Sequence, residues 1–182
     1  MLFYCLSATY AREPELKLSY PCMSLSMPFT KVRVIDCRDY HYIGYVQKGV
    51  GNIATDVRFE GKLKDTIKRF FLAADTSGMP KQELVVFLYD FFLTERTVGS
   101  GEIGEFKICT RFFYNSGNGL FTELKPVDTT YSFRAPNVTK ILLRSVSGHL
   151  CEIADLASTL QKIDSNTAYT KTQLNECLCL LL

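Results

Sequence analysis

The chain has 182 residues, of which 47% are hydrophobic and 22% are charged, which fits a single domain with an ordinary core. It carries 21 basic and 19 acidic residues. This near balance argues against a nucleic-acid-binding protein, which concentrates basic residues on one surface. No window holds the about 18 consecutive apolar residues that a membrane-spanning helix needs, so we expect no transmembrane span.

Seven cysteines are scattered along the chain, and no two have the Cys-x-x-Cys spacing of a zinc ribbon or a thioredoxin-like motif. The sequence therefore predicts neither a metal site nor a cofactor. Buried single thiols are one interpretation, because free cysteine packs as a small hydrophobe. If Cys5 is removed with a leader peptide, six cysteines remain and one or two disulfides can form, but the spacing does not assign their pairs.

Residues 1–11 (MLFYCLSATYA) are apolar and end in small residues before Arg12, as a signal-peptidase site does. A basic n-region is missing and the apolar core is short. Two interpretations follow, an exported protein with a signal peptide at residues 1–11 or a cytoplasmic protein with an ordinary N-terminal strand. Prolines interrupt residues 12–30, which predicts an extended segment at the edge of the domain.

Residues 31–37 are apolar on both faces, which predicts an interior strand on which the rest of the domain is built. Residues 41–50 form a second extended stretch, with a bulge or loop at its glycines. Apolar residues recur at helical spacing through residues 61–75, and Gly78 and Pro80 mark the helix end.

Three strands are expected next, at residues 83–94, 104–114 and 120–125, and residues 130–133 extend the last of them beyond Pro126. Asn and Gly residues at 115–119 predict a hairpin turn, since both tolerate positive φ. The last helix begins at residues 135–137. Its apolar stripe runs through about six turns and consists of Val138, Leu142, Val146, Leu150, Ile153, Ala157 and Leu160.

These elements predict an α+β fold, with a mixed or mainly antiparallel sheet of about five strands and two amphipathic helices packed on one face. The expected single domain spans residues 31–163. Residues 164–182 are polar at first and predict a loose C-terminal tail.

The densest group of polar residues is Asp36, Arg38, Asp39 and His41, at the end of the first strand of the domain. Loop residues at strand ends often carry function, because a rigid scaffold positions them. Two carboxylates and an imidazole can bind a ligand or serve as acid and base. The other interpretation, which we favour, is that Arg38 pairs with an acid and holds the turn. No catalytic residues are assigned, since no nucleophile motif is present.

A strand that ends in Val34-Ile-Asp-Cys-Arg38, followed by Ile43-Gly44, a helix and long antiparallel strands, resembles small bacterial envelope lipoproteins of the YajG and ABC-transport-auxiliary type. Those proteins share an Asp-x-Arg at the end of the first core strand and close with a long amphipathic helix. The resemblance covers about residues 31–160 and implies a mixed α/β domain, an envelope location and a non-catalytic accessory role. The chain departs from that pattern at its N-terminus, where Cys5 follows Phe3 and Tyr4 rather than a lipoprotein box.

We therefore expect a non-catalytic accessory protein of the periplasm or cell envelope, located in the periplasm or associated with the outer membrane, with other envelope proteins as partners. The alternative is a small-ligand carrier or enzyme with a groove site near Asp36, Asp39 and His41. The sequence does not define the oligomeric state.

Overall fold

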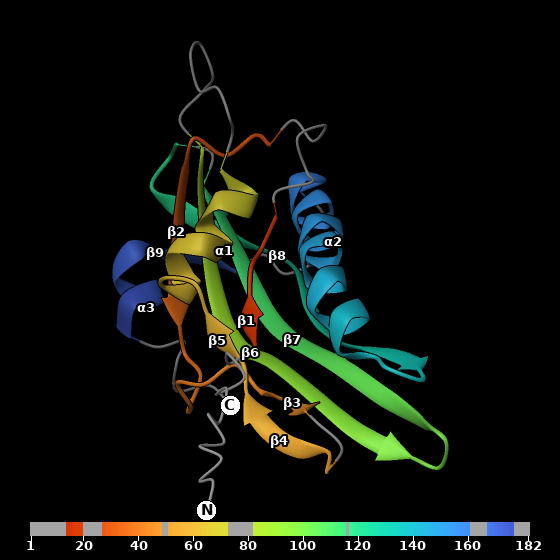
Figure 1. The fold of residues 1–182 in the computed structure, drawn as a ribbon. Coiled ribbons are helices and arrows are strands. Elements are labelled where there is room, and N and C mark those ends of the chain that lie inside the picture. The colour runs from red at the N-terminus through yellow and green to blue at the C-terminus, as the bar shows by residue number, and fades with distance from the viewer. Residues whose placement is uncertain are drawn as a thin grey trace, which may run out of the picture.

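The computed structural model describes residues 14–19, 27–48, 51–72, 82–115, 117–160 and 167–176. Over these residues the chain forms a mixed α/β fold with three helices and a five-stranded main sheet (Figure 1). The strands are β1 (Glu15–Leu16), β2 (Lys31–Asp36), β3 (Tyr45–Lys48), β4 (Ile53–Asp56), β5 (Arg58–Phe59), β6 (Glu83–Val98), β7 (Gly101–Asn115), β8 (Leu120–Ala135) and β9 (Ala168–Thr170). The helices are α1 (Leu63–Phe71), α2 (Thr139–Ser158) and α3 (Lys171–Glu176).

The main sheet has the strand order β2-β6-β7-β8-β9. β2 is parallel to β6, and the other neighbours are antiparallel. Figure 1 shows β6, β7 and β8 as the long strands that run the length of the molecule. Two short pairs accompany the sheet, β1 with β5 and β3 with β4. The expected hairpin strands are therefore confirmed, and each is longer than its sequence pattern predicted.

Apolar side chains on both faces of β6 are buried in two separate clusters, because alternate residues of a strand point to opposite faces. The larger cluster contains residues of β6, β7, β8, α1 and α2. The smaller cluster lies on the other face of the sheet and consists of Val85, Phe87, Tyr89, Phe113, Phe121 and Leu174. Its last member belongs to α3, so this helix covers part of the second face.

The apolar stripe of α2 is confirmed, since Leu142, Val146, Leu150, Ile153 and Ala157 are all buried. β7 approaches this helix closely at Gly104. A Cβ atom on Gly104 would lie 3.1 Å from the side chain of Val138 and 3.2 Å from that of Leu142. The missing side chain therefore sets how closely the helix packs on the strand.

The placement of residues 31–37 in the sheet differs from the prediction. Among the described strands, β2 pairs with β6 alone and is the edge strand of the main sheet, so it is not an interior strand there. Its two apolar faces arise because the sheet is covered on both sides at this edge. Val32 is buried in the larger cluster, and Ile35 packs against the smaller one. Burial on both faces does not require a neighbour on both edges.

The prediction of a loose tail from residue 164 is wrong for the described part of that segment. β9 pairs with the first residues of β8, and Leu174 of α3 is 1% exposed in the smaller cluster. A segment with one buried leucine is too short for hydrophobic periodicity to reveal it. β8 continues through Pro126, where a bulge shifts its register against β7 between Thr110 and Phe112.

Three sequence predictions fall outside the described residues, namely the signal peptide at residues 1–11, the helix end at Gly78 and Pro80, and part of the turn at residues 115–119. The described helices include none that is long and apolar enough to cross a membrane. Among the described cysteines, Cys37 and Cys151 each take part in a disulfide bond, and Cys109 is free.

Candidate functional site

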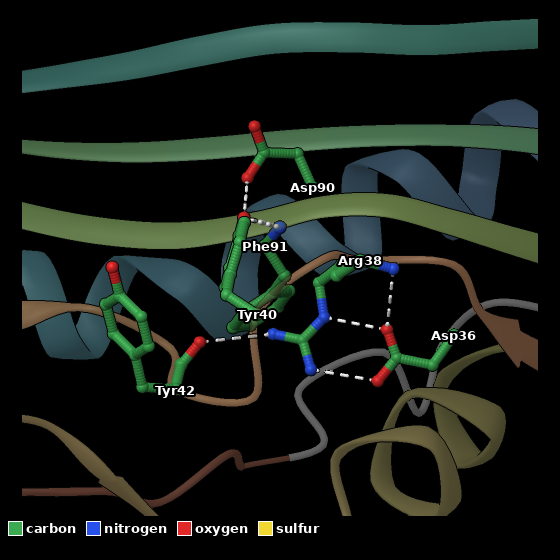
Figure 2. A network of polar contacts seen from close by, with 6 residues as sticks. All are labelled: Asp36, Arg38, Tyr40, Tyr42, Asp90 and Phe91. Carbon is green, nitrogen blue, oxygen red and sulfur yellow. Dashed lines mark hydrogen bonds and ion pairs between the residues drawn. The ribbon is translucent and has the colours of Figure 1, made fainter. Parts of the chain in front are cut away.

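The end of β2 is held by an ion pair between Asp36 and Arg38. Arg38 Nε donates to Asp36 Oδ1 at 2.8 Å, and Nη2 donates to Oδ2 at 2.9 Å. The same guanidinium donates through Nη1 to the carbonyl oxygen of Tyr42 at 3.4 Å (Figure 2). The Arg38 side chain is only 3% exposed, whereas that of Asp36 is 31% exposed. The bidentate pair thus closes the loop after β2 on itself.

Burial by itself would raise the pKa of Asp36, but the hydrogen bonds and charge of Arg38 outweigh it, and the charge of His41 adds to them. The net effect lowers the pKa of Asp36 below its usual value. A carboxylate that is ionised and already bidentate is a poor general base. The geometry matches the favoured expectation, in which Arg38 pairs with an acid and holds the turn.

Asp36, Asp39 and His41 have different surroundings. Asp36 is engaged by Arg38, and Asp39 is exposed. His41 is exposed and lines a pocket whose described walls include neither carboxylate. Within the described ranges, no three His, Cys, Asp or Glu side chains come together as a metal-binding group.

Aromatic side chains form a surface directly after this corner. We call Tyr40, Tyr42 and Phe92 the aromatic platform. Its ring centroids lie 5.4 Å apart for Tyr40 and Tyr42, 5.3 Å for Tyr40 and Phe92, and 5.4 Å for Tyr42 and Phe92. The Arg38 guanidinium lies 5.4 Å from the Tyr40 ring centroid. Tyr42 remains 53% exposed, so the platform faces solvent.

Polar groups of the central strands fix the platform from below. The Tyr40 hydroxyl donates to Asp90 Oδ1 and accepts a hydrogen bond from the backbone N–H of Phe91 (Figure 2). The other Asp90 oxygen pairs with Lys107 Nζ at 2.7 Å. Burial and the hydrogen bond to Asp90 raise the pKa of Tyr40, and the hydrogen bond to Asp90 raises that of Lys107. Tyr40 is therefore a neutral donor at physiological pH.

A pocket of about 430 Å³ adjoins the platform. It is lined by His41, Tyr42, Ile43, Asp56, Val57, Arg58, Phe59 and Gly61. Tyr42 belongs to both features, so a bound partner that covers the platform also reaches this pocket.

The sequence analysis missed the platform because its members come from separate segments. Tyr40 and Tyr42 follow β2, whereas Phe92 lies in the middle of an apolar run in β6. Asp90, the single charged residue of that run, was the available signal. It sits where the pairing of β6 with β7 shifts by one residue, between Leu88 and Asp90. Such bulges often re-aim a side chain near a functional site.

No protein-family model matches this chain, and no curated protein matches it. A solved structure described as "Crystal structure of uncharacterized protein" aligns over 78% of this chain and 97% of that chain. The two are 12% identical, with a TM-score of 0.34, which carries no argument about function.

Proposed function

We propose that this chain is an exported, non-catalytic accessory protein of the cell envelope that binds a partner protein through the aromatic platform. The observation that carries this proposal is the solvent-facing Tyr42, which is in ring contact with both Tyr40 and Phe92. Interface cores are enriched in Tyr, Phe and Arg and are surrounded by a polar rim. The platform consists of two Tyr and one Phe, with Asp90 and Lys107 at its margin.

The redox state of the cysteines supports export. Cys37 and Cys151 are disulfide-bonded, and structural disulfides persist in oxidising compartments such as the periplasm but are rare in the cytosol. The two cysteines lie on different elements, since Cys37 follows β2 and Cys151 is in α2. This agrees with the resemblance of residues 31–160 to YajG-type envelope lipoproteins, which itself implies an envelope location.

The arrangement of helices leaves room for a partner. We infer that α1 and α2 share one face of the sheet, because both contribute to the larger core cluster. Phe92 alternates with Phe91 and Leu93 of that cluster, so the platform lies on the opposite face. A partner at the platform therefore does not compete with α1 or α2, and α3 covers another part of the same face, around Phe87 and Phe113.

A second candidate function is a small-ligand carrier or enzyme at the pocket beside His41. The observation that favours it is the pocket volume of about 430 Å³, which falls within the usual range for small-molecule sites. Asp36 is less suited to this role than the sequence implied, because it is held by Arg38.

Photo-crosslinking in living cells tests the interaction proposal. A benzophenone amino acid replaces Tyr42 in one variant and Ile141 in a control variant, since Ile141 is 46% exposed on α2. We expect a single dominant protein adduct from position 42 and none of that mass from position 141. The adduct should disappear when Phe92→Ala is added, because the platform then loses one of its three rings. Equal adducts at both positions would contradict the proposal.

Thiol trapping tests the location. Whole cells are quenched with acid, and free thiols are labelled with a maleimide that adds mass, before and after reduction. We expect extra labelled thiols only after reduction, together with recovery of the protein in the envelope fraction. Full labelling without reduction, with the protein in the cytosolic fraction, would place it in the cytoplasm.

A further inference from the structure

One edge of the main sheet is open along most of β8. β9 covers only Leu120, Phe121 and Thr122 of this strand. From Val127 to Ala135 the strand pairs with β7 on one side and, within the described residues, with no strand on the other. Figure 1 shows this part of β8 at the margin of the sheet, beside α2. Every second residue there directs its backbone N–H and C=O outward, ready to pair with another strand.

Among the described residues, no further strand pairs along this part of β8, and its sequence lacks the residues that block pairing most strongly. Natural edge strands are protected by proline, by charged side chains and lysine above all, by β-bulges or by covering elements. Residues 127–135 read VDTTYSFRA and contain no proline, lysine or glycine. Pro126 stands just before them, at the bulge, so it protects the start of the edge and not its length.

The edge is complementary to itself. Two identical strands that pair antiparallel about a two-fold axis at Tyr131 place Asp128 opposite Arg134 of the second copy, and Arg134 opposite its Asp128. Thr130 then faces Ser132 of the second copy, so hydroxyl groups meet hydroxyl groups. Opposite charges and hydroxyl pairs at directly opposed positions stabilise antiparallel strands.

The neighbouring registers lose this match. Only alternate residues of the edge point their backbone groups outward, so each of these must pair with an outward-pointing residue of the second copy. The nearest allowed registers have their two-fold axis at Thr130 or at Ser132. An axis at Thr130 places Asp128 opposite Ser132, and an axis at Ser132 places it opposite Pro136. Both leave Arg134 without its acidic partner. The axis at Tyr131 is the register that pairs both charges twice.

The two faces of the strand fit such a pairing. Asp128, Thr130, Ser132 and Arg134 are exposed on one face, where the charge pairs would form. Arg134 forms no ion pair among the described residues, so it is available. On the helix face, Tyr131 and Phe133 are half-buried, and the His149 ring of α2 stacks on Tyr131 with centroids 3.5 Å apart. A second copy would extend this aromatic row across the axis.

We propose that two copies of this chain associate through β8 in an antiparallel, isologous dimer centred on Tyr131, which joins their sheets into one. The proposed interface shares no residue with the aromatic platform, since β7 lies between β8 and Phe92 of β6. A monomeric protein that still gives the position-42 adduct would overturn the dimer alone and leave the proposed function standing. The interface is isologous, because both copies contribute the same surface to it.

Charge reversal with rescue tests this dimer. Asp128→Arg and Arg134→Asp each place like charges opposite one another in the proposed register, whereas the double variant restores both pairs. The purified, oxidised protein is measured by sedimentation equilibrium. We expect each single variant to weaken the dimer by at least about tenfold in dissociation constant, and the double variant to return close to the parent value. Both residues are exposed, and circular dichroism checks that each variant is folded.

A register test uses heterologous cysteines. Protein with Thr130→Cys is mixed with protein with Ser132→Cys under oxidising conditions. Directly opposed strand residues lie at Cα separations that permit a disulfide. We expect the mixed disulfide dimer to exceed the self-linked product of either protein alone. A monomer at about 100 μM, a dimer unaffected by both reversals, or a double variant as weak as the single ones would each overturn the proposal.

Discussion

The Glu95 carboxylate is buried beneath the start of α2, although it stands in the polar half of a long strand. It is 1% exposed, and its Oε2 accepts a hydrogen bond from Thr139 Oγ1 at 2.7 Å. Glu102 lies beside it and accepts from the backbone N–H of Val138 at 2.7 Å. Burial and the charge of Glu102 raise the pKa of Glu95, while Thr139 opposes them. Two carboxylates therefore bind the start of α2, and the charge of Glu102 disfavours the ionised form of Glu95.

Replacing Glu95 by glutamine should stabilise the protein at high pH. The folded-state pKa of Glu95 is raised, so protonated Glu95 contributes its full stabilisation below the unfolded-state pKa. This stabilisation is lost as the pH rises through the folded-state pKa. Glutamine keeps the acceptor for Thr139 and removes the charge. We expect Glu95→Gln to raise the free energy of unfolding by about 1 kcal/mol at pH 8 and to have little effect at pH 4.

Urea denaturation at several pH values measures this effect. Glu105→Gln is the matched control, because Glu105 alternates with the buried Phe106 and so lies on the opposite face of β7. A gain for Glu95→Gln that is equal at pH 4 and pH 8 would contradict the titration account.

The ion pair of Asp36 and Arg38 should contribute to the stability of the fold. Truncating Arg38 leaves an ionised Asp36 without its bidentate partner and frees the Tyr42 carbonyl. We expect Arg38→Met to lower the free energy of unfolding by about 1–2 kcal/mol, which is modest because Asp36 is partly exposed. The double variant with Asp36→Asn should cost less than the sum of the two single variants. Additive losses in this double-mutant cycle would show that the two side chains act independently.

At the level of elements, backbone conformation decides how β6 receives the loop after β2. Gly44 has a φ of +123°, and a Cβ atom there would lie 1.9 Å from the carbonyl oxygen of Leu93. The two segments are joined by a bridge at these residues, and the Leu93 N–H donates to the Ile43 carbonyl at 2.9 Å. A side chain at position 44 therefore separates the loop from the sheet edge.

Alanine at Gly44 and alanine at Gly148 should have opposite effects. Gly148 lies inside α2, and a Cβ atom there meets nothing within 4 Å. We expect Gly148→Ala to raise the free energy of unfolding by about 0.5–1 kcal/mol through helix propensity. Gly44→Ala should lower it by about 3 kcal/mol or more, because strain and a clash with the backbone combine. Thermal melting of both variants, measured side by side, checks the two signs, and a Gly44→Ala protein as stable as the parent would contradict the close approach.

Disulfides act on the molecule as a whole. Cys37 and Cys151 each take part in a disulfide bond, and they lie on different faces of the sheet, since Cys37 packs against the smaller cluster and Cys151 against the larger. Reduction should lower the free energy of unfolding by about 2–4 kcal/mol per broken bond. Urea denaturation with and without dithiothreitol measures the loss. Cys109→Ser, at the free cysteine, controls for thiol chemistry and should leave the difference unchanged.

Local hydrophobic patterns were sufficient to predict the long helix and the long strands, because buried residues recur in them at a regular spacing. The stripe from Val138 to Ala157 in α2 and the apolar run of β6 identify a helix and a strand wherever they are placed. The Asp36 and Arg38 pair was also predictable, because its partners are two residues apart. Patterns failed for elements too short to show a period and for contacts between segments that are far apart in the sequence. α3 is an example, because it buries a single leucine.

The class of fold, the three long strands of the hairpin region and the two longer helices can be predicted from the residues alone, because the period of burial shows in neighbouring residues. The position of β2 at the edge of the sheet cannot, since apolar faces indicate cover above and below a strand and not neighbours to either side. Only the tertiary structure decides this position, and it also decides that Tyr40, Tyr42 and Phe92 meet in the aromatic platform. Contacts between separate segments depend on strand order and register, and these are properties of the assembled sheet.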